Sequence, residues 1–355
     1  MKSVLSVLGL VMALCSASAA LATPVQLTQI GSLSCTYLIC GASAGARIKS
    51  AGRYLYTEAQ DVGLNVYDVR TPSAPALLTT VTSLRQGGDV IVSGRYIYLV
   101  SNRGIQIADA VNPAAPVLVG QVGFTSLSAT MSGMSGKYIY AGLKIVDISD
   151  PTAPTVVGSL PVSGPGTPNG LALSGTNAYV TDDSGRVHIL DVSDPTAASE
   201  IGYIDLGEPA YDIAISGTNA YVVTHGEYCD DEGCTKSPGH LTVLDISGSS
   251  FASVVSAIVR PKAPEGIFIS GGYAYLSELS TNFYSYAGEL TVVDIRSPTA
   301  PIDVAWAGTV TFAGSYTLNY SPQGVAVIGN AAYVTTPWNL YVYSAFKDSQ
   351  PPQCQ

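Results

Sequence analysis

Residues 170–195 read GLALSGTNAYVTDDSGRVHILDVSDP, and this stretch decides the fold. It holds three short apolar segments separated by turn-forming residues, a pattern typical of β-strands. Gly175 precedes Tyr179 by four residues, and this spacing recurs seven times along the chain. A strand-rich unit that repeats every ~40 to 50 residues predicts an all-β, seven-bladed propeller with four-stranded blades. The pairs are Gly52/Tyr56, Gly94/Tyr98, Gly136/Tyr140, Gly175/Tyr179, Gly217/Tyr221, Gly271/Tyr275 and Gly329/Tyr333.

The composition argues against two classes of partner. The chain has 16 Lys and Arg against 26 Asp and Glu, for a net charge of −10. Nucleic-acid binding needs clustered basic residues that neutralise phosphates, and the basic residues here are isolated along the sequence. The same charge balance argues against docking on anionic lipid. We therefore expect neither a nucleic acid nor a lipid surface as partner.

The segment 1–22 has the pattern of a signal peptide. Lys2 precedes an apolar run, Val4–Leu14, and small residues then lead to a cleavage site before Thr23. The run is too short to span a membrane. We expect an exported protein, periplasmic, cell-surface or secreted. An alternative is lipid anchoring through Cys15, although the leucine before it departs from the usual motif.

The mature chain is expected to form one domain over residues 24–346, with a mobile tail over 347–355 that is rich in proline and glutamine. Five cysteines remain after cleavage. Two C-x4-C pairs in an exported protein predict two short-loop disulfides. Cys354 is left over and is either free or paired with another chain. The expected disulfides are Cys35–Cys40 and Cys229–Cys234.

The third strand of six units ends in aspartate, often shortly before a proline. Asx side chains bond the backbone of tight turns, and proline fixes φ there. We interpret these carboxylates as turn caps rather than as a ring of metal or substrate ligands. They are Asp68, Asp109, Asp147, Asp191, Asp245 and Asp294.

The stretches LKIVDISDPTAP (143–154) and LTVLDIS (241–247) resemble the LVIVD repeat. The resemblance extends over nearly the whole mature chain. It implies an exported or surface protein of bacteria or archaea with a propeller fold. The family has no general activity or catalytic motif, so the resemblance implies no enzymatic residues.

The last unit contains three strands, at 324–328, 331–335 and 340–344, instead of four. The segment Val25–Gly31 resembles the fourth strand of other units. We therefore expect the N-terminal strand to complete the last blade, which would hide both sheet edges.

The repeats differ from one another at four segments. Two are insertions between strands two and three, Thr224–His240 and Glu278–Glu289, and two precede an inner strand, Ser34–Gly45 and Ala307–Gln323. In a propeller both loop classes emerge on one face, which we call the insertion-bearing face. The opposite face carries the uniform turns and is called the turn face. Function is expected on the insertion-bearing face.

The favoured function is non-enzymatic binding of an extracellular or envelope protein or glycan by a monomer that needs no cofactor. A rigid ring would present the irregular loops, and aromatic side chains dominate interface energies. The expected partner-binding residues are Tyr228, Phe283, Tyr284, Tyr286, Tyr316 and Tyr320.

Polar residues at the starts of the inner strands form a second candidate site, at the mouth of the central channel. An alternative function is a metal-dependent hydrolase or lyase with Asp89, Asp212 and Glu265 as ligands. The structural interpretation is that the two aspartates accept backbone N–H bonds. A third function is a purely architectural envelope component. The channel-mouth residues are Arg47, Asp89, Tyr211, Asp212, Glu265 and Gln323.

The insertion 224–240 also offers a possible zinc site. Its spacing H-x3-C-x4-C-x5-H places His225, Cys229, Cys234 and His240 in an array of two nitrogens and two sulfurs. A disulfide between the two cysteines is favoured in an oxidising compartment. The third histidine, His188, lies in mid-strand and is interpreted as packed or edge-exposed rather than catalytic.

Overall fold

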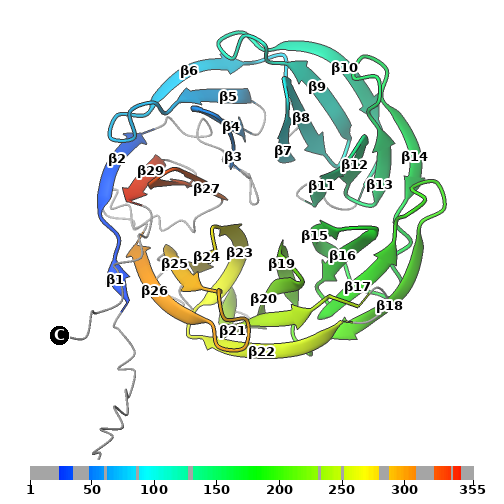
Figure 1. Cartoon of the computed structure of the whole chain (residues 1–355), viewed down its shortest axis with the longest axis vertical. Helices are drawn as coiled ribbons and strands as arrows, with labels where there is room; N and C mark the ends of the chain where they lie inside the picture. Colours follow the sequence, from blue (N-terminus) through cyan, green and yellow to red (C-terminus); the bar gives the residue numbers. More distant parts are fainter. Residues whose placement is uncertain are drawn as a thin grey trace, which may run out of the picture.

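The computed structural model describes residues 24–34, 48–59, 62–84, 88–126, 131–230, 233–248, 252–279, 288–308, 324–336 and 339–344, and the side chains of all of these except 59, 228–230 and 233–235. Figure 1 shows seven blades arranged around a central axis. This confirms the predicted seven-bladed all-β propeller. None of the described segments forms a helix that could cross a membrane. The expected signal peptide and the tail 347–355 lie outside the described residues.

The first four blades follow the chain from inner to outer strand. Blade 1 has β3 (Ile48–Ala51), β4 (Tyr54–Ala59), β5 (Gly63–Asp68) and β6 (Ala76–Val81); blade 2 has β7 (Gly88–Ser93), β8 (Tyr96–Ser101), β9 (Gly104–Asp109) and β10 (Val117–Gly123); blade 3 has β11 (Ser132–Ser135), β12 (Tyr138–Ala141), β13 (Lys144–Asp147) and β14 (Thr155–Ser159); blade 4 has β15 (Pro168–Ser174), β16 (Asn177–Asp182), β17 (Arg186–Asp191) and β18 (Ser199–Asp205).

The remaining blades include both ends of the described chain. Blade 5 has β19 (Ala210–Ser216), β20 (Asn219–Asp230), β21 (Gly233–Asp245) and β22 (Ser253–Arg260); blade 6 has β23 (Ala263–Ser270), β24 (Tyr273–Leu279), β25 (Gly288–Asp294), β26 (Ile302–Gly308) and an added strand, β1 (Val25–Gln26); blade 7 has β27 (Gly324–Ile328), β28 (Ala331–Thr335), β29 (Asn339–Ser344) and β2 (Gln29–Ser34).

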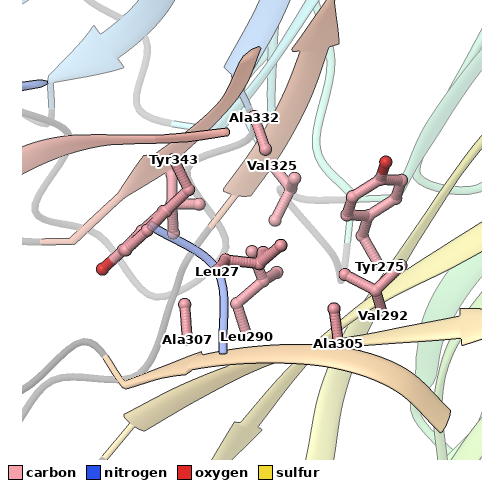
Figure 2. Packing of buried hydrophobic residues seen from close by; sticks show 10 residues of the cluster. Leu27, Tyr275, Leu290, Val292, Ala305, Ala307, Val325, Ala332 and Tyr343 are labelled. Carbon is pink, nitrogen blue, oxygen red and sulfur yellow. The ribbon is translucent and has the colours of Figure 1, made fainter. Parts of the chain in front are cut away.

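The N-terminal segment closes the ring, as predicted. Strand β2 pairs antiparallel with β29 and so supplies the outer strand of blade 7. The strand differs from the expected Val25–Gly31, because Val25 and Gln26 pair instead with β26 of blade 6, in parallel. The segment therefore crosses from one blade to the next, and its Leu27 is buried between them (Figure 2).

The repeated glycine and tyrosine have separate structural roles. All seven repeat glycines have φ between 56° and 59°, a left-handed conformation that glycine adopts at no steric cost in the turn between strands one and two. The seven tyrosines are at most 3% exposed and pack between blades. The hydroxyl of Tyr221 donates to Ile295 O (3.3 Å), and that of Tyr333 donates to Val69 O (3.4 Å), in each case on the next blade. The repeat thus encodes both the turns and the blade contacts.

The six strand-ending aspartates cap turns, as predicted. In each, Oδ1 accepts a hydrogen bond from the backbone N–H two residues later, at 2.7 to 3.0 Å. Asp150 and Asp194 cap the following proline turns in the same way. Hydrogen bonds from Ser149 and from the ammonium of Lys137 lower the pKa of Asp147 to about 2. These carboxylates therefore stabilise the turn face.

Neighbouring blades approach closely at the outer strands. A Cβ atom added at Gly120 would lie 2.0 Å from Pro151 O, and one at Gly158 would lie 2.1 Å from Pro195 O, in each case in the proline turn of the next blade. Blade 5 has Ser256 at the equivalent position, and its hydroxyl donates to Pro298 O at 2.6 Å. A small residue is therefore required where the outer strand meets a proline turn.

We expect Gly158→Ala to lower the free energy of unfolding by about 1–3 kcal/mol, because the backbone carbonyl of Pro195 must move to admit the methyl group. The matched control is Gly202→Ala, at the same ladder position of blade 4, where an added Cβ meets nothing within 4 Å. Urea denaturation of both variants measures the difference. Equal losses in the two would show that the close approach does not matter.

Candidate functional site

The predicted insertion 224–240 forms a long hairpin on the insertion-bearing face. Strands β20 and β21 have 12 and 13 residues, whereas no other described strand exceeds eight. Their antiparallel pairing runs from Asn219–Asp245 at the turn face to Asp230–Gly233 at the tip, with a register shift between His225 and Glu227. Both strands also contact β23, the inner strand of blade 6. The hairpin therefore extends blade 5 and leans on its neighbour.

A buried histidine fastens the hairpin to blade 6. His225 of β20 is fully buried, and its ring stacks on that of Tyr211 with centroids 3.8 Å apart and planes at 6°. Its Nδ1 donates to Gly226 O at 3.0 Å. Its Nε2 lies 3.3 Å from Glu265 Oε1 without a well-aligned hydrogen bond. Lys236 of β21 forms an ion pair with the same carboxylate, and its ammonium lies 5.8 Å from the Tyr211 ring centroid.

The charges of this cluster are set by burial and by its neighbours. Burial opposes ionisation of Glu265, but the contacts with His225 and Lys236 outweigh it and lower the pKa of the carboxyl. Burial, together with the nearby carboxylates of Glu265, Glu227 and Asp183, raises the pKa of Tyr211 to about 12. At neutral pH the cluster thus contains a carboxylate and an uncharged phenol, and the carboxylate is held by a lysine.

The other side of the hairpin is fastened to the segment between blades 4 and 5. His240 Nδ1 lies 2.9 Å from Glu208 Oε2, and the Thr224 hydroxyl donates to the same oxygen at 3.1 Å. In the ladder, Thr224 pairs with His240, so these two side chains share one face of the sheet and His225 lies on the other. The two histidines therefore contact opposite neighbours.

This arrangement does not bring together the four residues of the possible zinc site. His225 and His240 are on opposite faces of the hairpin, and each is engaged with a glutamate. Cys229 and Cys234 are paired across the ladder, but their side chains are outside the described part of the structure. No group of three or more metal-ligating side chains occurs among the described residues.

Two of the channel-mouth aspartates connect inner strands of adjacent blades. Asp89 is 1% exposed and accepts hydrogen bonds from Val90 N (2.8 Å) and from the hydroxyl of Ser132 on blade 3 (2.7 Å). Asp212 accepts from Ile213 N (2.9 Å) and from Ile267 N on blade 6 (3.1 Å). These contacts agree with the structural interpretation of both residues. Both carboxylates therefore link inner strands of adjacent blades.

A small cavity lies at the channel beside Asp212. Its volume is about 60 Å³, and Lys49, Phe268 and Ser277 also line it. That space holds a few water molecules. The described lining does not form a pocket for a larger ligand.

The remaining predicted site residues lie outside what the structure describes. For Tyr228 the backbone alone is placed, opposite Thr235 in the hairpin. The others are Arg47, Gln323, Phe283, Tyr284, Tyr286, Tyr316, Tyr320, Cys35 and Cys40.

Sequence reasoning missed two buried charge clusters. In blade 4, His188 is fully buried between two carboxylates: Nδ1 lies 2.6 Å from Glu200 Oε1, and Nε2 lies 3.0 Å from Asp182 Oδ2. Between blades 5 and 6, Arg260 binds Glu278 through Nε (2.8 Å) and Nη2 (3.0 Å), and Asp303 through Nη1 (2.6 Å). The full burial of His188 agrees with the expectation that it is packed.

A signal for the first cluster exists in the repeat. The third-strand position three residues before the terminal turn residue is polar or aromatic in every blade, with Asn65, Gln106 and Lys144 at the positions equivalent to His188. Such a position inside an apolar strand indicates a buried polar network. The partners are far apart in sequence and cannot be identified from it.

The comparisons with known proteins agree with this geometry. The sequence profile of the LVIVD repeat matches residues 45–83, 85–123, 133–161, 165–205 and 264–305, together more than half of the chain. The matched ranges leave out 206–263, which include the long hairpin. No curated protein matches the sequence.

Several solved structures share the fold. The β-propeller domain of Cps50 (Swd1) from Myceliophteria thermophila is 13% identical, with a TM-score of 0.60, over 89% of this chain and 100% of that one. A protein from Lactobacillus plantarum is 14% identical, with a TM-score of 0.55, over 75% and 88%. The N-terminal domain of Nup159 is 8% identical, with a TM-score of 0.58, over 90% and 95%. At these identities the likeness concerns the fold alone.

Proposed function

Because this chain belongs to the LVIVD repeat family, whose shared feature is a scaffold, we propose that its function lies in what it adds to the repeats: it binds an extracellular or envelope protein or glycan through the insertion-bearing face. The observation that carries the proposal is the β20–β21 hairpin, the longest in the described structure, which falls outside the matched repeats.

The way the hairpin is fastened supports a binding role. It is held on one side by His225 and Lys236 against Glu265, and on the other by His240 against Glu208. A loop held in this way loses little further conformational entropy when a partner binds it. The aromatic residues expected at the interface, Tyr228 in this hairpin and five more in the segments 278–289 and 307–323, would then supply the contact area.

The hairpin register supports the proposed disulfide. Cys229 and Cys234 are directly opposite in an antiparallel ladder. Opposite Cα atoms there are about 4.5 to 5.5 Å apart, within the range of about 4.4 to 6.8 Å that a disulfide spans. Export, which we also propose, would provide the oxidising compartment. The protein would act as a monomer without a cofactor.

The test is capture with a variant that lacks the hairpin tip. Residues 228–235 are replaced by Asn-Gly, which suits a two-residue turn between the ladder partners Glu227 and Lys236. The mature protein and this variant are immobilised and exposed to envelope and secreted fractions and to a panel of purified glycans. A control variant, Lys137→Ala, changes an exposed side chain on the turn face.

We expect one saturable ligand to bind the mature protein and the Lys137→Ala control with equal affinity. The hairpin variant should lose at least tenfold in affinity while keeping its circular dichroism spectrum and melting temperature. Equal binding by the hairpin variant, or no ligand for the mature protein in any fraction, would contradict the proposal.

The anchoring of the hairpin leads to a prediction of its own. We expect Glu265→Gln to raise amide hydrogen exchange in β20 and β21 beyond Thr224 by about 5- to 30-fold, because His225 and Lys236 lose their carboxylate, at a cost of about 1–2 kcal/mol. Exchange in blade 2 should be unchanged and provides the internal control. Unchanged exchange in the hairpin would show that this contact does not hold it.

A further inference from the structure

The outer strands of the blades have one inward-facing position that differs in blade 6. At this ladder position the other six blades carry valine, leucine or isoleucine, which pack against the third strand. Blade 6 has Ala307 there, opposite Leu290. The equivalent residues are Val81 in blade 1, Val122 in blade 2, Leu160 in blade 3, Ile204 in blade 4, Ile258 in blade 5 and Leu33 in blade 7.

Leu27 fills the space that the small side chain of Ala307 leaves. It is 8% exposed and belongs to the cluster that contains Ala307, Leu290 and Tyr343 (Figure 2). Its N–H donates to Trp306 O at 2.7 Å. The leucine directly follows β1, so the blade 6 core is completed by a side chain from the N-terminal segment.

The outer edge of β26 pairs with β1, next to the contact between Leu27 and Ala307. Val25 pairs with Ala305 and Gln26 with Trp306, in parallel. Among the described residues, no other outer strand has a further strand on its free edge. An exposed edge offers unpaired N–H and C=O groups to an incoming strand. Only in blade 6 is this edge combined with space for a leucine.

We propose that the free edge of β26 and the space over Ala307 form a peptide-binding site, and that Val25–Leu27 is its resident ligand in cis. The site takes an extended peptide parallel to β26, with an aliphatic residue opposite Ala305 and a leucine over Ala307. The occupant in trans is a partner segment with this aliphatic–polar–leucine pattern. The surface is on the outer rim, at the end of β26 where the segment 307–323 begins.

Strand β1 has two properties of a replaceable ligand. It has two residues and is followed by a single buried anchor, Leu27, so it can detach locally while β2 stays paired with β29. Its attachment through Thr28 to β2 gives it a high effective concentration, on the order of mM, which a peptide in trans must overcome. Weakening the cis anchor should therefore open the site.

The experiment measures binding of a fluorescent peptide, TPVQLTQ (residues 23–29), to the full mature chain by polarisation. We expect Leu27→Ala to bind it at least tenfold more tightly than the wild type, whose site is filled. The same peptide with its leucine replaced by alanine should bind at least tenfold more weakly, because it loses the apolar area that the leucine buries.

A second substitution tests the space itself. Ala307→Leu in the Leu27→Ala background should abolish binding and restore part of the lost melting temperature, because the blade then supplies its own aliphatic side chain. The matched control is Ala257→Leu, at an exposed position on β22 equivalent to Trp306, which should leave binding unchanged.

The outcomes are decisive in both directions. If Leu27→Ala is folded and does not bind the peptide at mM concentration, or binds it regardless of Ala307→Leu, the site does not exist as proposed. If Leu27→Ala does not fold, Leu27→Val replaces it under the same criteria. Failure of Ala307→Leu to restore folding would also overturn the assignment.

Discussion

Replacing His188 by leucine should lower the free energy of unfolding at pH 7 by about 3–5 kcal/mol, one of the largest losses expected for this protein. The imidazole is fully buried between Asp182 and Glu200 and contacts both. Removing the imidazole leaves the Asp182 and Glu200 carboxylates without the partner that both contact, in a medium of low polarity. Guanidinium denaturation, with the slope checked for two-state behaviour, measures the loss.

The loss of stability in His188→Leu should depend on pH in a defined direction. Burial opposes ionisation of Asp182 and Glu200, but their hydrogen bonds, first of all with His188, outweigh it and lower both pKa values. A lowered pKa contributes stability at neutral pH that is lost as the pH falls through the folded-state pKa. In the variant the same carboxylates lose their contact with the imidazole. Protonation at low pH then removes their unpaired negative charges.

The difference in stability between wild type and His188→Leu should therefore be largest near pH 7 and shrink towards pH 4. The triple variant His188→Leu, Asp182→Asn, Glu200→Gln serves as control. It removes both charges and should recover part of the loss at pH 7. A difference that does not depend on pH would show that the cost comes from packing instead.

The second large effect is expected at Arg260, where Arg260→Met should cost about 3–5 kcal/mol. Arg260 is 3% exposed, and its guanidinium holds Glu278, which is 1% exposed, together with Asp303. Burial works against its charge, but the contacts with these carboxylates outweigh it and raise the pKa of Arg260. Methionine keeps much of the side-chain volume and leaves both carboxylates without the cation. Chemical denaturation measures the loss.

An exposed arginine provides the matched control. Arg296 forms an ion pair with Asp294 on the turn face and is 52% exposed. Exposed pairs contribute about 0–1 kcal/mol, so Arg296→Met should be nearly neutral. Adding Glu278→Gln to Arg260→Met should recover part of its loss. Similar costs at Arg260 and Arg296 would contradict the importance of burial.

Much of the fold could be predicted because each repeat encodes local physics. Gly175 and its six equivalents fix the left-handed turns, and Asp147 and its equivalents cap turns within two residues of themselves. These interactions are local, so they can be predicted from the sequence alone. The course of the N-terminal segment was predicted less fully, because it depends on a contact between Leu27 and Ala307, 280 positions away in the numbering.

The candidate site was predicted in part, for the same physical reason. The insertion 224–240 was identified as a departure from the repeat, and the channel-mouth residues Tyr211 and Glu265 were identified as polar residues at the starts of inner strands. Lys236 and His225 were not recognised as their partners, because the contacts depend on the hairpin leaning over blade 6. Hairpin length is visible in a sequence, but its inclination is set by tertiary packing.

The seam between β2 and β29 also determines how the ring should respond to mechanical force. Gln29 pairs with Tyr343 at one end of this ladder, and Ser34 pairs with Asn339 at the other. The chain therefore enters β2 and leaves β29 at the same end. Tension applied across the two flanking segments would separate the pairs one after another instead of loading them all together. Under such tension β1 should detach from β26 first, and the seam should then open, losing the outer strand of blade 7 while the other six blades remain folded.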